Sequence, residues 1–150
     1  MEENLEIQEP IVIEPEDVIQ PSNGKEETPL EESILNCIKR MLGPSYDDNS
    51  FDTDIIIHIN STFTTLRQLG VGPEKGYRIS SSDNKWSEFV RDEEMLDSVK
   101  TYIYLKVKLV FDPPLNGTLY DAFERQTKEL EWRLNVSVES DPIGGESNEQ

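Results

Sequence analysis

Residues 102–114 read YIYLKVKLVFDPP, and the structure of this stretch decides the fold class. Its odd positions up to Phe111 are all apolar and two of its even positions are lysine, which alone is typical of a half-buried β-strand. However, no glycine or proline occurs between Arg91 and Asp112. A strand of that length is improbable in a small domain, whereas a helix of that length is ordinary. The sequence therefore favours one long helix over residues 92–111.

A helix over this segment is apolar on two faces. One set of apolar residues recurs at intervals of three and four and is predicted to face the core. A second set lies roughly on the other side of the cylinder, which is typical of a helix at the centre of its domain or one shared with another subunit. The core set is Leu96, Val99, Ile103, Val107 and Val110; the second set, predicted to lie at a subunit or partner interface, is Tyr102, Leu105 and Leu109.

Helix-start and helix-stop residues delimit three further helices. Thr28 and Glu31 have the spacing of a capping box at the start of residues 29–42. A glycine follows that segment and another follows a second helix over residues 51–69, while two prolines precede a last helix over residues 117–135. The core residues predicted on these helices are Ile34, Ile38, Ile55, Ile59, Phe63, Leu66, Phe123, Leu130 and Leu134.

Three smaller features complete the expected fold. Trp132 lies well off the apolar face of the last helix, so we expect it to make a second contact with a neighbouring subunit or partner. The NVSVES segment after that helix is expected to be extended, and residues 77–86 allow a small β-hairpin within a glycine-rich loop. The predicted fold class is therefore mainly α, with four helices.

Charge divides the chain into three parts. Acidic residues number 31 and basic residues 14, which gives a net charge of −17, and much of this charge lies near the ends of the sequence. We expect a flexible acidic arm over residues 1–28, a helical domain over residues 29–138 and a flexible tail over residues 139–150. So negative a surface disfavours tight binding to nucleic-acid backbone, and no apolar run approaches the roughly 20 residues of a membrane span.

Side chains suited to catalysis are scarce. The only histidine, His58, has Asp54 one helical turn before it. A metal site needs further ligands, and a catalytic triad needs a nucleophile beside the base. Cys37, the only cysteine, lies in an apolar helical pattern that is typical of a core residue. The sequence therefore predicts no enzyme activity, no metal and no cofactor, although an enzyme using His58 and Asp54 stays open as the least favoured alternative.

Five segments together resemble the head–tail connector, or adaptor, proteins of tailed bacteriophages and prophages of Gram-positive hosts. The segments are ILNCIKRMLG, FDTDIIIHINSTFTTLRQLGVGP, WSEF, VKTYIYLKVKLVFDPP and KELEWRLNV, within about residues 30–138. The resemblance implies a small, helical, non-enzymatic virion protein, made in the host bacterial cytoplasm. It also implies a ring, commonly of about twelve subunits, below the portal protein.

Such a ring extends the DNA channel without sequence-specific binding and offers a docking surface to the next head-completion or tail protein. Two observations agree with this expectation: the long helix has two unlike apolar faces, and an acidic wall repels DNA phosphates. The alternative that the charge leaves open is an acidic soluble regulator or DNA mimic that binds a partner protein.

Overall fold

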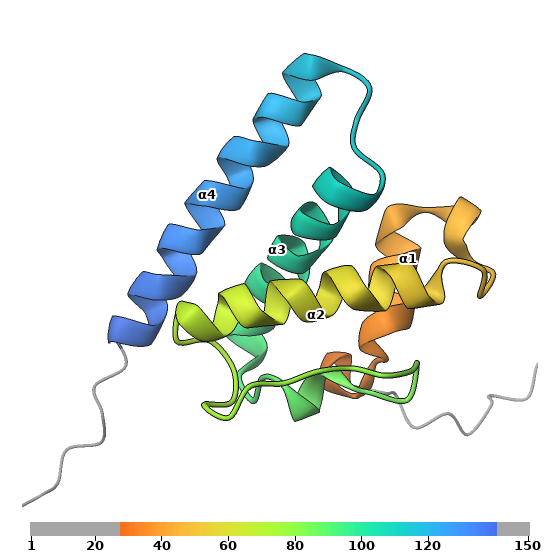
Figure 1. Cartoon of the computed structure of the whole chain (residues 1–150). Helices are drawn as coiled ribbons and strands as arrows, with labels where there is room; N and C mark the ends of the chain where they lie inside the picture. The colour runs from red at the N-terminus through yellow and green to blue at the C-terminus, as the bar shows by residue number, and fades with distance from the viewer. Residues whose placement is uncertain (1–27, 141–150) are drawn as a thin grey trace, which may run out of the picture.

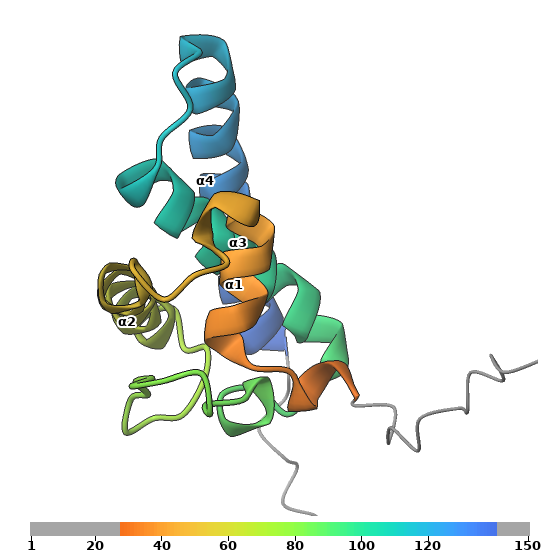
Figure 2. The ribbon, with the colours of Figure 1, turned by 90° about the vertical axis from the view of Figure 1, so that its right-hand side faces the viewer.

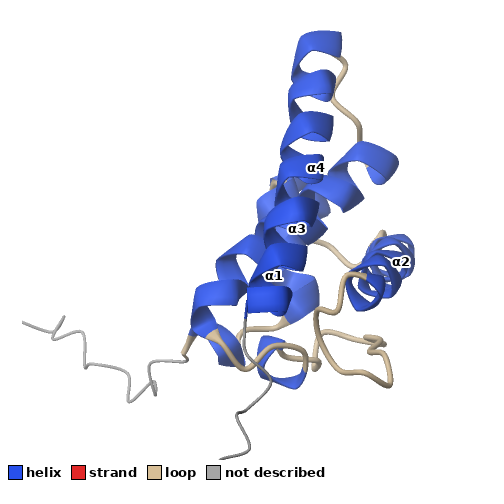
Figure 3. Cartoon of the chain, turned by 90° about the vertical axis from the view of Figure 1, so that its left-hand side faces the viewer, coloured by secondary structure: helices blue, strands red, loops and turns tan. Residues whose placement is uncertain are grey.

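The computed structural model describes residues 28–140, which form helices and loops without a strand. Figure 3 shows this mainly α composition, which confirms the predicted fold class. The predicted arm and tail lie outside the described residues, except for residue 28 and residues 139–140. The α-helices are α1 (Ile34–Leu42), α2 (Asp52–Gln68), α3 (Glu93–Phe111) and α4 (Gly117–Ser140), and the short 3-10 helices are η1 (Pro29–Glu31), η2 (Pro44–Tyr46) and η3 (Trp86–Glu88).

The long helix α3 is the centre of the domain and contacts α1, α2 and α4. Figures 1 and 2 show α4 running antiparallel beside α3 after the turn at residues 112–116, and α2 crossing α3. The α3 helix begins as the sequence predicts, because the Asp92 side chain accepts a hydrogen bond of 2.9 Å from the backbone N–H of Glu94. The alternation in residues 102–111 is therefore that of a helix with neighbours on more than one side.

Most of the predicted core residues are buried. Every one on α1 and α2 is at most 1% exposed. On α4, Leu134 is fully buried and Leu130 is half-buried against the core, whereas Phe123 is half-buried with its ring 6.5 Å from that of Tyr104. On α3, four of the five predicted residues are at most 1% exposed: Leu96, Val99, Ile103 and Val107.

The exception on α3 is Val110, which is 65% exposed, so its assignment to the core was wrong. In the last turn of α3 it is Phe111 that packs inward. Its ring lies 5.3 Å from the ring of Tyr46 and 5.8 Å from that of Phe51, measured between centroids. Helical spacing correctly places Val110 near the core stripe, but the neighbouring helices do not extend to cover that position.

The second apolar face of α3 is covered by α4 of the same chain. Tyr102 is fully buried and Leu105 is 2% exposed, so the prediction that both face a neighbouring subunit was wrong. The Tyr102 hydroxyl donates a hydrogen bond of 2.7 Å to Oε1 of Glu131 on α4. This contact satisfies the one polar atom of a side chain that the helix pair otherwise buries among apolar groups.

The first predicted helix is divided at Glu32. Residues 29–31 form a 3-10 turn, Glu32 is extended, and α1 begins only after Ser33, whose hydroxyl accepts a 3.3 Å hydrogen bond from the backbone N–H of Asn36. Thr28 makes no side-chain capping bond, so the predicted capping box was wrong. The extended backbone at Glu32 instead accepts a hydrogen bond of 3.3 Å from the Trp86 N–H. A tertiary contact therefore replaces the local helical one.

The hairpin allowed at residues 77–86 does not form. The segment is an irregular loop held by side-chain amides, which supply the bonds that a partner strand would supply. The Asn60 amide on α2 donates to the carbonyl of Ile79 at 3.0 Å and accepts from its N–H at 2.8 Å. Within the loop, Oδ1 of Asn84 accepts a 2.9 Å hydrogen bond from the N–H of Ser80.

The α4 helix is longer than the sequence predicts. It continues to Ser140, so the expected extended NVSVES segment is helical, and Val138 in this last part packs against the core. A Cβ on Gly70 would lie 3.0 Å from Cγ1 of Val138, which shows how closely the loop after α2 approaches the end of α4. Packing against this loop supplies the stability that the β-branched residues of the segment do not supply locally.

A buried ion pair joins α1 to α2. Nζ of Lys39, whose side chain is 6% exposed, lies 2.7 Å from Oδ1 of Asp52, whose side chain is 26% exposed. Asp52→Ala leaves the buried ammonium of Lys39 without its ion-pair partner. The substitution is therefore expected to lower the free energy of unfolding by about 2 kcal/mol, which is a smaller loss than the one expected for a fully buried pair. Urea unfolding tests this expectation against Asp54→Ala, an exposed acid in the same helical turn. Equal losses in the two variants would contradict it.

Candidate functional site

Between residues 28 and 140 there is no group of three or more His, Cys, Asp or Glu side chains that could hold a metal ion. His58 is half-buried, and its ring packs 6.0 Å from that of Phe111. Burial raises the pKa of the Cys37 thiol and the nearby Glu32 carboxylate adds to the increase, so the thiol stays protonated and unreactive.

A charged cluster around Glu32 joins the start of the domain to α1 and α3. Oε1 of Glu32 lies 2.5 Å from Nη1 of Arg40, and Oε2 lies 3.0 Å from Nζ of Lys100. The Lys100 ammonium also lies 5.7 Å from the centre of the buried Trp86 ring. Partial burial alone would raise the pKa of Glu32, but the hydrogen bonds from Arg40 and Lys100 outweigh it and hold the pKa below its ordinary value.

The Glu32 cluster predicts a specific pH dependence. Because the pKa of Glu32 is lower in the folded chain than its ordinary value of 4.5, the carboxylate stabilises the fold above that pH and stops doing so as the pH falls through the folded-state pKa. Glu32→Gln is therefore expected to unfold at a lower temperature than wild type at pH 7, and the difference is expected to disappear at a pH below the lowered pKa of Glu32. Thermal unfolding at both pH values checks this, and a difference that is the same at both would contradict it.

Several large apolar side chains remain exposed outside the core. Three of them surround the turn between α3 and α4 and are called the tip: Val110, Leu115 and Leu119. Leu115 is fully exposed, and Trp132, farther along α4, is 66% exposed. Exposed apolar groups that gather in this way are typical of surfaces that bind another protein. Within residues 28–140, the remaining exposed large apolar side chains are Phe51 and Ile57.

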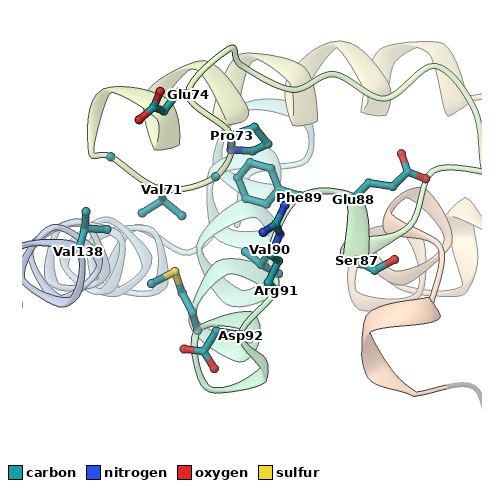
Figure 4. Close-up of a pocket in the computed structure, with 13 residues that line it drawn as sticks. Val71, Pro73, Glu74, Ser87, Glu88, Phe89, Val90, Arg91, Asp92 and Val138 are labelled. Carbon is teal, nitrogen blue, oxygen red and sulfur yellow. The ribbon is translucent and has the colours of Figure 1, made fainter. Parts of the chain in front are cut away.

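A groove of about 750 Å³ lies between the loop after α2, the segment before α3 and the end of α4. Figure 4 shows Val71, Phe89 and Val138 reaching it from three separate elements. Gly72 lines the groove with φ +89°, and a Cβ there would lie 2.2 Å from Cε2 of Phe89, so only glycine fits. The lining combines these apolar groups with charged side chains, which are Glu74, Glu88, Arg91 and Asp92.

A comparison with protein families identifies the relationship. The model of the family described as "Phage connector protein" matches residues 34–141, well over half of the chain. The chain belongs to this phage connector family. A search of curated proteins and a search of solved structures found no match. Membership assigns the chain to bacteriophage proteins with a structural connector role, which agrees with the all-helical fold.

The connector fold places the four residues predicted at an interface in three different environments. Trp132 is exposed and free to contact another protein, Leu109 is half-buried, and Tyr102 and Leu105 are inside the subunit. Leu115 was not predicted at an interface, although its position directly after two prolines was a usable signal. A proline-bounded turn between two antiparallel helices lies at the end of the pair, where a leucine has no neighbours within its own subunit.

None of the helices formed by residues 28–140 has both the length and the apolar character required to cross a membrane.

Proposed function

We propose that the connector forms a closed ring, of about twelve copies, at the head–tail junction of a phage particle. In this proposal the ring docks below the portal protein, extends the channel through which DNA passes, and presents its other side to the next head-closure or tail protein. Family membership supports this proposal, since a connector joins other parts of the particle. The single observation in the subunit that carries it is the pair of unlike exposed apolar surfaces on α4, at Leu119 and Trp132.

These two side chains differ in direction as well as position. Thirteen residues separate them, which corresponds to about 20 Å along the helix axis and about 140° around it. Two different surfaces on one subunit produce head-to-tail contacts, and such contacts form a ring when the rotation between neighbours closes. The tip of one subunit and Trp132 of the next are therefore the proposed contact pair.

Charge supports passage of DNA rather than binding. The whole chain carries −17 and its described part, residues 28–140, carries 13 basic and 19 acidic side chains. A channel wall with a net negative charge repels DNA phosphates, so the double helix passes without being held. No base-reading element is needed for this role, which requires only a wall of the right diameter.

Binding to the portal protein tests the proposal. The purified full-length connector, mixed with the portal protein of the same phage, is expected to co-sediment with it at a defined ratio of connector to portal subunits. Trp132→Glu serves as the matched variant, because it leaves the exposed surface folded but is expected to reduce the number of copies bound. A connector that does not sediment with the portal protein at any concentration would contradict portal docking.

A further inference from the structure

Three cationic side chains gather at one shallow pocket of the domain. Arg67 at the end of α2 and Lys75 and Arg78 in the following loop line a hollow of about 260 Å³, together with the rings of Phe63 and Tyr77. All three cations are exposed. None of them takes part in the ion pairs found within residues 28–140, which use other lysines and arginines. In a chain of net charge −17, this basic pocket is a local exception.

The walls of the basic pocket are held in place by the fold. Nε of Arg67 donates a 2.9 Å hydrogen bond to the carbonyl of Glu74. Gly76 has φ +84°, and a Cβ there would lie 3.6 Å from Cδ of Arg67, so the arginine stem lies directly over this turn. The Tyr77 hydroxyl donates a 2.7 Å hydrogen bond to Oε2 of Glu88, while its ring lies 5.2 Å from that of Phe63. The pocket is therefore organised before anything binds to it.

The chain itself contains a segment of complementary chemistry. Residues 1–27 carry nine acidic side chains and one lysine, and they include apolar runs such as IVI between the acids. Acidic groups pair with cations such as these, and the half-buried ring of Tyr77 offers an apolar surface beside them. A DNA duplex fits less well, because it would bring many phosphates against a domain whose overall charge is negative.

The start of the described chain is linked to the pocket through η3. η1, which begins one residue after Thr28, packs against η3. Tyr77 of the pocket is bonded to Glu88, the last residue of η3. A segment of 27 residues spans up to about 90 Å when extended, so distance does not limit its reach. Tethering also raises its effective concentration at the pocket to the millimolar range.

We propose that the acidic N-terminal segment, residues 1–27, docks on the basic pocket of its own chain. The docked acids neutralise Arg67, Lys75 and Arg78 and prevent DNA from adhering there. The inference does not depend on ring formation, since it concerns contacts within one chain. It is electrostatic in large part, so the contact is expected to weaken as the salt concentration rises.

Zero-length carbodiimide cross-linking of the full-length protein tests the inference. The reagent joins a lysine to a carboxylate in contact with it, and peptide mass spectrometry identifies the partners. Lys75 is expected to join acids of residues 1–27 roughly tenfold more often than Lys128, an exposed lysine on α4 that reports random encounters. In a mixture of isotopically light and heavy protein, the two peptides of each link are expected to carry the same label, because the link forms within one chain. Equal yields at the two lysines, or links only between chains, would overturn the proposal.

Two charge-matched variants separate a specific pocket from general attraction. Arg67→Gln with Arg78→Gln is expected to lower the Lys75 yield to the level of Lys128. Arg125→Gln with Arg133→Gln removes two positive charges from α4 instead and is expected to leave the Lys75 yield unchanged. An equal decrease in both pairs would contradict a specific pocket.

A DNA-binding measurement distinguishes the other occupant. Fluorescence anisotropy of a labelled duplex is expected to show the same weak binding in wild type, where the acidic segment occupies the pocket, and in the Arg67→Gln, Arg78→Gln variant, where two of its three cations are absent. If wild type binds the duplex and that variant does not, DNA is the occupant and the proposal is wrong.

Discussion

Trp132→Glu is expected to abolish self-association of the connector while leaving the subunit folded. The indole is 66% exposed, so the substitution removes little packing within the subunit. At an interface the same change removes a large aromatic contact, which often contributes 2 kcal/mol or more, and buries a charge without a partner. Together these effects weaken association by at least about 100-fold. Sedimentation velocity over a range of concentrations measures this loss.

The matched control for this experiment is Gln126→Glu. Gln126 is exposed on the same helix, about 120° around the axis from Trp132, and its replacement makes the same change in net charge. It is expected to associate as wild type does. Equal association of Trp132→Glu and wild type would remove Trp132 from the interface, whereas loss of association in both variants would point to charge rather than to the indole.

Trp86→Ala is expected to cause the largest loss of stability of any single substitution considered for the core. Trp86 is fully buried at the start of η3. Its backbone N–H donates a hydrogen bond to the carbonyl of Glu32 at the start of the domain. Truncation of a buried tryptophan costs about 3–5 kcal/mol, which corresponds to a fall of roughly 20 °C in the melting temperature of a domain of this size. Thermal and urea unfolding measure the change.

Trp86→Phe distinguishes packing from hydrogen bonding in that experiment. The indole Nε1 of Trp86 is buried and has no hydrogen-bond partner within residues 28–140. Phenylalanine keeps most of the aromatic volume and removes this unsatisfied donor, so it is expected to cost far less than alanine. A phenylalanine variant as unstable as the alanine variant would show that the indole itself, including its contact with the Lys100 ammonium at 5.7 Å, is what the site requires.

Periodicity predicted the helices well because this signal is local. The α3 helix illustrates this: Asp92 caps it, no breaker interrupts it, and the alternation of residues 102–111 results from two apolar faces. The buried stripes of α1 and α2 followed from the same rule, since a stripe at helical spacing must face other apolar groups. Nothing in those predictions required knowledge of where the neighbouring helices lie.

The errors arose where distant residues decide the structure. Helical spacing assigns Val110 and Tyr102 to faces of α3, but it does not show where α2 ends or that α4 returns along the second face. Thr28 failed as a cap because the backbone of Glu32 bonds to Trp86, more than fifty residues away. The loop that resembled a hairpin is instead held by Asn60 of α2. Each contact depends on the assembled fold, so no local pattern contains it.

The same limit applies to the candidate contact surfaces. The exposure of Trp132 was predictable, because an aromatic residue far from the apolar stripe of an amphipathic helix does not face the core. The tip depends on how far the α3–α4 pair extends beyond the rest of the domain, which Figure 1 shows and the sequence does not. The basic pocket combines residues of α2 and a loop whose path is set by glycines and by Asn60.

Image averages of the full-length connector bound to its portal protein, obtained by electron microscopy, test the central claim most directly. The account predicts a closed ring of about twelve connector copies, coaxial with the portal and with an open channel wide enough for a DNA duplex. Single copies attached to the portal, or open chains of connectors that never close, would contradict it.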